Sequence, residues 1–230
     1  MERRTPHGVG IGLHSRHYDA IVATPEPIDG LEIVAEDFLG RGGRARRVLR
    51  DCARRWPIGA RGISGNLGGP DALDFAHLRA LRRWLEEVGS PWYCDALGYC
   101  SIDGHALHDI FPMPLTPEAV QHLVGRIGIV QDVLERPVHV HDVAHYATMP
   151  GSTMTAGQFL TEVVERADCG LWLDLACLYV DAANQGVDAF ELLAEVPRHR
   201  VEVIRLGGCT RTREGRLVAG RGGRVPPQVM

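Results

Sequence analysis

The stretch that decides the fold is Cys169-Gly170-Leu171-Trp172-Leu173-Asp174, a short apolar run that ends in a carboxylate. A run of this length, bounded by polar residues, is typical of a core β-strand. The same pattern recurs on both sides of it along the chain. The predicted strands are Val9–Leu13, Leu31–Val34, Ile58–Ile63, Trp92–Leu97, Val138–His141, Gly170–Asp174 and Val201–Leu206.

Helical patterns fill the segments between these strands. Two of the helices carry start signals, because Pro117 follows Thr116 as a first-turn proline and Thr155 has capping-box spacing to Gln158. Strands that alternate with helices indicate βαβ units and a parallel sheet. The predicted helices are Arg44–Arg55, Phe75–Val88, Pro117–Leu134, Phe159–Ala167 and Asp188–Ala194.

The predicted fold class is α/β, a parallel TIM-type barrel. Such a barrel has eight strands, so about seven predicted strands indicate an incomplete one. We expect a barrel-like domain over residues 1–209 and a tail rich in Arg, Gly and Pro over residues 210–230. The barrel is therefore expected either to be open or to be covered at the gap by a homo- or hetero-oligomeric partner. An uncovered edge strand would favour aggregation.

The composition excludes several classes of function. The 230 residues carry 25 basic and 29 acidic side chains, a net charge of −4, which gives no reason to expect nucleic acid or an anionic membrane as partner. Neither a membrane span nor a signal peptide is visible, so a cytoplasmic protein is expected. The six cysteines form no CxxC pair and are predicted to be reduced and mostly buried.

Residues at the carboxyl ends of the predicted strands are the candidates for chemistry, because the active site of a parallel barrel gathers there. His139 and His141 are two apart on a strand and therefore share a face, as metal ligands or as structural histidines. Asp174 needs a cation, a metal or hydrogen-bond donors to end an apolar strand. An ion pair with Arg205 is the plain structural alternative to a metal.

A resemblance to a known family covers nearly the whole chain. The motifs that carry it are Gly8-Val9-Gly10-Ile11-Gly12-Leu13, His17-Tyr18, Leu31-Glu32-Ile33, Glu36-Asp37-Phe38, Asp74-Phe75-Ala76-His77-Leu78, His108-Asp109-Ile110-Phe111-Pro112-Met113-Pro114, Cys169–Asp174, Tyr179-Val180 and Asn184-Gln185-Gly186. On these motifs the chain resembles the multinuclear non-heme iron-dependent oxidases, which include the methanobactin maturase. This resemblance implies a TIM-type barrel that binds two or three irons and oxidises residues of ribosomally made peptides, usually with a peptide-binding partner protein.

The chain departs from the family's pattern at positions that the resemblance implies as iron ligands. Alanine stands at 96 and 219, and arginine stands at 61, 205 and 221. An alanine side chain cannot ligate, and a guanidinium is a permanent cation without a lone pair. A multinuclear iron cluster is therefore not expected. Arg61, Arg205 and Arg221 at one barrel mouth are predicted to bind an anion or an anionic substrate, such as a carboxylate or a phosphate.

Four presumed ligand positions keep side chains that bind metals. These are His141, Asp174, Cys177 and Cys209, a set that suits a single zinc or iron ion. The alternative is drift in a site that has lost its role, with cysteine as a small core residue. The predicted cofactor is accordingly none or one metal ion, and no catalytic residue is identified.

Two functions follow from these observations, and the sequence leaves open whether the protein is an enzyme. The first is a non-catalytic binding or partner protein in the biosynthesis of ribosomal-peptide natural products. The second is a metal-dependent oxidoreductase with a remodelled mononuclear site that oxidises a peptide or small substrate. A shortened, non-functional gene product is a third possibility.

Overall fold

The computed structural model describes residues 5–23, 28–144, 146, 149–220 and 224–230. The chain divides into two compact units, and the boundary between them passes within β4, α4 and β7. The first unit comprises Met1–Gly65, Ala72–Asp95 and Ile129–Val138. The second comprises Asn66–Asp71, Ala96–Gly128 and His139–Met230.

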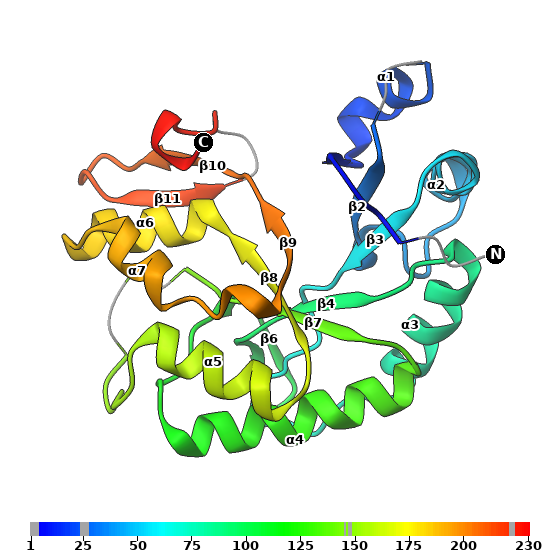
Figure 1. Cartoon of the computed structure of the whole chain (residues 1–230). Helices are drawn as coiled ribbons and strands as arrows, with labels where there is room; N and C mark the ends of the chain where they lie inside the picture. Colours follow the sequence, from blue (N-terminus) through cyan, green and yellow to red (C-terminus); the bar gives the residue numbers. More distant parts are fainter. Residues whose placement is uncertain (1–4, 24–27, 145, 147–148, 221–223) are drawn as a thin grey trace. The chain divides into compact units, whose positions relative to one another are not determined.

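The elements follow one another in an alternating order (Figure 1). Up to β4 they are β1 Gly10–Gly12, η1 Ser15–His17, α1 Tyr18–Ala23, β2 Gly30–Val34, η2 Ala35–Asp37, α2 Gly43–Arg55, β3 Ile58–Arg61, α3 Phe75–Val88 and β4 Tyr93–Ala96. After β4 they are β5 Tyr99–Ile102, β6 His105–Phe111, α4 Pro117–Leu134, β7 Val138–His141, α5 Ala156–Arg166, β8 Gly170–Asp174, α6 Leu175–Gln185, α7 Ala189–Glu195, η3 Arg198–Arg200, β9 Val201–Arg205, β10 Gly208–Arg211, β11 Leu217–Gly220 and η4 Pro227–Val229.

The first unit is built on a parallel sheet in which β1, β2, β3 and β4 pair in that order. Leu31 lies opposite Ile58, and Ala60 lies opposite Tyr93. These four residues are buried, as expected for parallel strands covered on both faces. Gly59 is required between them, because a Cβ there would lie 2.4 Å from the ring of Trp92.

Helix α3 shows how the sequence sets a helix and its packing in this unit. The side chain of Asp74 accepts hydrogen bonds from the backbone N–H groups of Ala76 and His77, which caps the first turn. Gly89 ends the helix in the left-handed conformation that favours glycine. The side chains that α3 buries, spaced three or four residues apart as predicted, are Leu78, Leu81, Leu85 and Val88.

The second unit contains the parallel strands β7, β8 and β9, again paired in sequence order. His139 of β7 lies opposite Gly170, and Asp174 at the end of β8 lies opposite Arg205 of β9. The predicted capping box of α5 is present: Thr155 accepts from the backbone of Gln158, whose side chain accepts from the backbone of Thr155. The capping-box signal at Thr155 is therefore confirmed, although α5 begins at Ala156 and not at the predicted Phe159.

Two antiparallel hairpins are differences from the prediction. Strands β5 and β6 form one, and β10 and β11 form the other, which packs on α6 (Figure 1). Their strands are largely exposed, so they lack the apolar runs that mark core strands. Side chains from elsewhere hold them in place: Asn184 of α6 both donates to and accepts from the backbone of Leu217 at 2.8 and 2.9 Å.

All seven predicted strands are present as β1, β2, β3, β4, β7, β8 and β9. Strands β7 and β8 have the predicted ends, and the other five have ends shifted by one or two residues. Helices α1 and α6 are additional to those that were predicted. The residues predicted as a tail, 210–230, include β11 and η4. Among the described helices, none combines the length and the apolar character that a bilayer crossing requires.

His139 gives the fold a specific dependence on pH. Its side chain is buried against Gly170, and burial lowers its pKa from 6.5 to about 4. Between these two values the unfolded chain binds a proton at this residue that the folded chain does not bind. We therefore expect the free energy of unfolding to fall, as pH drops from 6.5 toward 4, by about 1.4 kcal/mol per pH unit through this residue.

Urea unfolding of the wild type and of His139→Gln across this pH range measures the effect. The variant should lose this part of the slope, whereas the control His105→Gln, on an exposed hairpin position, should keep it. Parallel curves for the wild type and His139→Gln would show that folding does not lower the pKa of His139.

Candidate functional site

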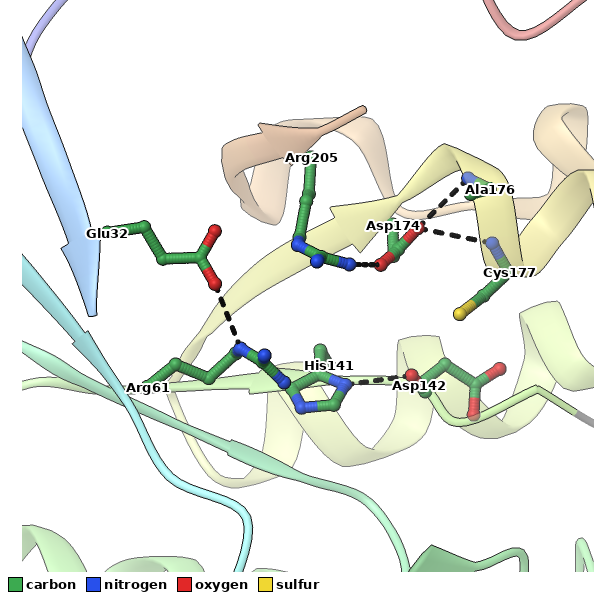
Figure 2. A network of polar contacts seen from close by, with 8 residues as sticks. All are labelled: Glu32, Arg61, His141, Asp142, Asp174, Ala176, Cys177 and Arg205. Atoms are coloured by element: carbon green, nitrogen blue, oxygen red, sulfur yellow. Dashed lines mark hydrogen bonds and ion pairs between the residues drawn. The ribbon is translucent and has the colours of Figure 1, made fainter. Parts of the chain in front are cut away.

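An ion pair joins the carboxyl ends of β8 and β9 in the second unit. Nη1 of Arg205 lies 2.5 Å from Oδ2 of Asp174, whose side chain is only 10% exposed (Figure 2). The other oxygen, Oδ1, accepts hydrogen bonds from the backbone N–H groups of Ala176 and Cys177 at 2.9 and 3.1 Å. Both oxygens of Asp174 are thus engaged, one by a cation and one as the N-cap of α6.

This arrangement answers the question that Asp174 raises in the sequence. A carboxylate that ends an apolar strand needs compensation, and the guanidinium and two backbone donors supply it. The Arg205–Asp174 ion pair expected as the alternative to a metal ligand is present. Gly207 lies beside the pair: a Cβ there would make an ordinary contact with Nη1 of Arg205 at 3.5 Å and a tight one with the side chain of Ala176 at 3.0 Å.

Cys177 lies in the first turn of α6, within the field of several carboxylates. Burial, followed by the negative charges of Asp174, Asp142 and Asp181, raises the pKa of its thiol well above the ordinary value. Because the thiolate is the nucleophile and the metal ligand, the protonated thiol favoured here is a weak candidate for either role. Its contribution is that of a small, half-buried side chain.

His141 ends β7 in a half-buried position. Its Nδ1 lies 2.9 Å from the carbonyl oxygen of Asp142 (Figure 2). A carbonyl only accepts, so Nδ1 carries the hydrogen and the lone pair of the neutral ring is on Nε2. Histidines that bind metals are often oriented by a backbone carbonyl in this way.

The four candidate metal ligands all belong to the second unit. Cys209 is on β10, opposite Ala219 in the hairpin, and is half-buried. Within the part of the chain that the structure describes, no three His, Cys, Asp or Glu side chains come together as a group that could hold a metal ion. The metal-ligand role of His141, Asp174, Cys177 and Cys209 stays a prediction.

A small cavity of about 60 Å³ adjoins the ion pair, between β8 and the helices α5, α6 and α7. Its walls are mainly apolar, with Asp174 and Cys177 on one side. This volume suits a few water molecules or one small side chain, not a folded substrate. The apolar lining residues are Ala156, Leu160, Leu171, Trp172, Leu173, Leu178, Leu192 and Val196.

The first unit carries an ion pair of its own. Nε of Arg61, at the end of β3, lies 3.1 Å from Oε1 of Glu32 on β2 (Figure 2). Both side chains are largely buried, at 10% and 22% exposure. The predicted anion-binding residues Arg61 and Arg205 are therefore each engaged by a carboxylate, and Arg221 lies outside the described residues.

A network of buried acids supports the loop after β3. Oε1 of Glu36 accepts from the backbone of Ile63 and from both the backbone and the hydroxyl of Ser64. Close to this loop, Tyr93 donates to Oδ2 of Asp95 at 2.8 Å, and both residues are fully buried. Burial, and then the charges of Asp95 and Glu36, raise the pKa of Tyr93 well above its usual value, so the phenol keeps the proton that it donates to Asp95.

The partners Glu32 and Tyr93 were not identified from the sequence. Glu32 interrupts the apolar run Leu31–Val34, which signals a buried charge in need of a cation. Arg61 at the end of the next predicted strand was the obvious candidate. The sequence gives no comparable sign of the hydrogen bond between Tyr93 and Asp95, because both residues lie in a run that is typical of any core strand.

Solved structures with the same arrangement of strands and helices are TIM-barrel proteins. D-psicose 3-epimerase from Clostridium cellulolyticum H10 matches with a TM-score of 0.57 and 14% identity, over 94% of this chain and 76% of that one. A xylose isomerase-like TIM barrel/4-hydroxyphenylpyruvate dioxygenase fusion protein matches with a TM-score of 0.54 and 18% identity, over 87% of this chain and 31% of the fusion. At such identities the likeness shows the fold alone, and the predicted TIM-type parallel α/β class is confirmed.

Proteins related in sequence show a higher identity to this chain than these solved structures do. A UPF0276 protein of Caulobacter vibrioides is 36% identical over 208 residues, which cover 90% of this chain and 74% of the relative. A UPF0276 protein of Pseudomonas aeruginosa is 38% identical over 209 residues, covering 90% and 73%. The family model for the RiPP precursor modification enzymes MbnB/TglH/ChrH matches residues 8–230. This chain therefore belongs to the MbnB/TglH/ChrH family, whose description is that of enzymes that modify the precursors of ribosomally made peptides.

Proposed function

We propose that this protein acts as a non-catalytic binding or partner protein in the biosynthesis of a ribosomal-peptide natural product. Membership of a family of peptide-precursor modification enzymes supports the peptide setting. The proposed difference from that family is the loss of the multinuclear iron cluster that the sequence resemblance implies. The protein would hold a peptide, or an active relative, without oxidising it.

The observation that carries the proposal is the engagement of Asp174. Arg205 takes one oxygen of this carboxylate, and the first turn of α6 takes the other. A metal at this carboxylate would have to displace the guanidinium or the two backbone donors. Removing the guanidinium's partner would leave its charge without compensation in a site of 23% exposure, which is costly.

The donor set at the other implied ligand positions also does not fit a cluster of two or three irons. Ala96 and Ala219 offer no donor atom, and Arg61 is a cation that already pairs with Glu32. Guanidinium groups have no lone pair for a metal and repel it electrostatically. No step of a reaction is therefore assigned to an iron cluster in this chain.

A remodelled single-metal site is the second candidate function, as a metal-dependent oxidoreductase. The orientation of His141 favours it, because the hydrogen bond from Nδ1 to the carbonyl of Asp142 leaves Nε2 with the lone pair. The raised pKa of Cys177 weighs against it, since a metal would have to displace the thiol proton. Asp174 and Cys209 would complete the set.

Other parts of the proposal rest on the sequence. Arg61, Arg205 and Arg221 remain proposed as an anion-binding group, although the first two would bind an anion only through N–H groups not used by Glu32 and Asp174. Cover of an open barrel edge by a second copy or another protein remains proposed, as does a cytoplasmic location.

The iron content of the purified protein tests the non-catalytic role. Protein purified without air and without a metal-chelating tag should contain well under one iron per chain, because the ligand positions hold alanine and arginine. Inductively coupled plasma mass spectrometry measures this directly. Two or more irons per chain would refute the proposal and restore an oxidase role with different ligands.

The same measurement of metal content distinguishes the single-metal oxidoreductase from the non-catalytic protein. About one zinc or iron per chain, lost in both His141→Ala and Cys209→Ala, would support the single-metal site. As a matched control, Cys100→Ala changes a half-buried thiol of the β5–β6 hairpin and should leave the metal content unchanged.

Energetic coupling between Asp174 and Arg205 is the next prediction. Breaking the pair by Asp174→Asn or Arg205→Met should destabilise the protein by about 2 kcal/mol each, because one charge is left largely buried without its partner. The double variant should cost clearly less than both changes together, with a coupling free energy of about 1–2 kcal/mol. Denaturant unfolding of the four proteins measures the cycle.

The control cycle uses the exposed pair Arg54–Asp51, whose atoms are 3.5 Å apart. There the coupling should stay below about 0.5 kcal/mol. Additive effects of the Asp174 and Arg205 changes would show that the two residues do not pair in solution.

A further inference from the structure

Helix α2 of the first unit concentrates positive charge on a chain that is acidic as a whole. Between Gly43 and Arg55 it contains six arginines and one aspartate, a net charge of +5, while the whole chain has −4. The rest of the chain therefore carries −9. Arg41, just before the helix, extends the basic stretch.

The arginines share the solvent-facing side of α2. Leu49, Cys52 and Ala53 face the core, and every arginine of the helix is exposed. Measured side-chain exposures range from 53% for Arg46 to 68% for Arg54. We call this surface the arginine face; its residues are Arg41, Arg44, Arg46, Arg47, Arg50, Arg54 and Arg55.

Carboxylates of the same unit neutralise only part of the arginine face. Asp19 pairs with Arg44, Asp51 pairs with Arg54, and Glu87 of α3 is shared by Arg46 and Arg50. Arg41 and Arg47 are exposed and form no ion pair with any described carboxylate. Among the described residues, these three carboxylates thus pair with four of the seven guanidiniums, and the charges of Arg41 and Arg47 leave a positive excess.

We propose that the arginine face is a docking surface for an acidic segment of a peptide, a proposal that rests on the peptide-binding function given above. The surface already shows the required chemistry: Arg46 binds both oxygens of Glu87, with Nη2 at 2.9 and 3.0 Å. Such forked contacts to carboxylates are the geometry that a guanidinium favours. A helix of 13 residues is about 20 Å long, enough to follow about six residues of an extended peptide.

The details favour a peptide over nucleic acid. The nearest aromatic residue, Trp56, is buried and lies 4.0 Å under the guanidinium of Arg55, so it cannot stack on a base. Asp51 and Glu87 would repel a continuous phosphate backbone, whereas a peptide can place its acidic residues beside the arginines that remain.

Binding of a fluorescein-labelled peptide of alternating Glu and Ala, 14 residues long, tests the proposal by fluorescence anisotropy. The wild type should bind it, and binding should weaken with added NaCl, because exposed charges are screened over about 10 Å at 0.1 M salt. The double variant Arg41→Glu/Arg47→Glu should bind about tenfold more weakly at low salt. It leaves the internal ion pairs of the arginine face intact, so it should fold normally by circular dichroism.

The matched control is Arg198→Glu/Arg213→Glu, which makes the same change in net charge at exposed arginines of the second unit. It should alter binding by less than about twofold. Equal weakening in both variants, or binding of a Gln-for-Glu version of the peptide, would refute a specific acidic-peptide surface. Tighter, Arg47-dependent binding of an RNA duplex or of phosphatidylserine vesicles would refute the proposed occupant.

Failure of this proposal can be told apart from failure of the proposed function. The substitutions at Arg41 and Arg47 lie outside the site at the carboxyl ends of the strands, so the metal content of the variant should equal that of the wild type. An iron cluster found in both proteins would refute the non-catalytic role and leave the arginine face in place. Absence of iron together with no binding of the acidic probe would refute only the arginine face.

Discussion

A charge at the end of a buried strand must meet an opposite charge or hydrogen-bond donors, because desolvation of an isolated ion is very costly. Asp174 shows this constraint most clearly. It ends β8 opposite Arg205 of β9, and the ion pair between them lies where the two strands stop and α6 starts. The cap of α6 and the local charge balance both depend on this one carboxylate.

The same constraint sets what the site can do. In a parallel barrel the strand ends supply the functional side chains, and here two of the implied positions are taken by paired arginines. Arg61 pairs with Glu32 and Arg205 pairs with Asp174, so at these positions, where the sequence resemblance implies metal ligands, the side chains form internal ion pairs. Family membership fixes the ancestry and the peptide-modification setting, but the chemistry depends on these side chains.

Arginine has a different role on the surface. On α2 it is exposed and exceeds the available carboxylates, so it can bind a partner, whereas at the strand ends each guanidinium is satisfied from within its own unit. The environment of each residue decides which of these roles it has. A surface guanidinium is hydrated and exchanges partners readily, while a buried one is costly to leave unpaired.

The sequence by itself determined the order of the seven parallel strands and the approximate position of most helices, because apolar runs, caps and helical spacing are local signals. Strand β8, the capping box at Thr155 and the buried stripe of α3 are examples. It also determined the family. The sequence also named Arg205, 31 residues beyond Asp174, as one of the alternative partners of that carboxylate. Only the tertiary structure showed that this ion pair forms and that Glu32 pairs with Arg61. The ion pairs follow from the register of neighbouring strands, which no local sequence pattern shows. The two exposed hairpins are held by side chains distant in sequence, such as Asn184, so they also lack a local pattern.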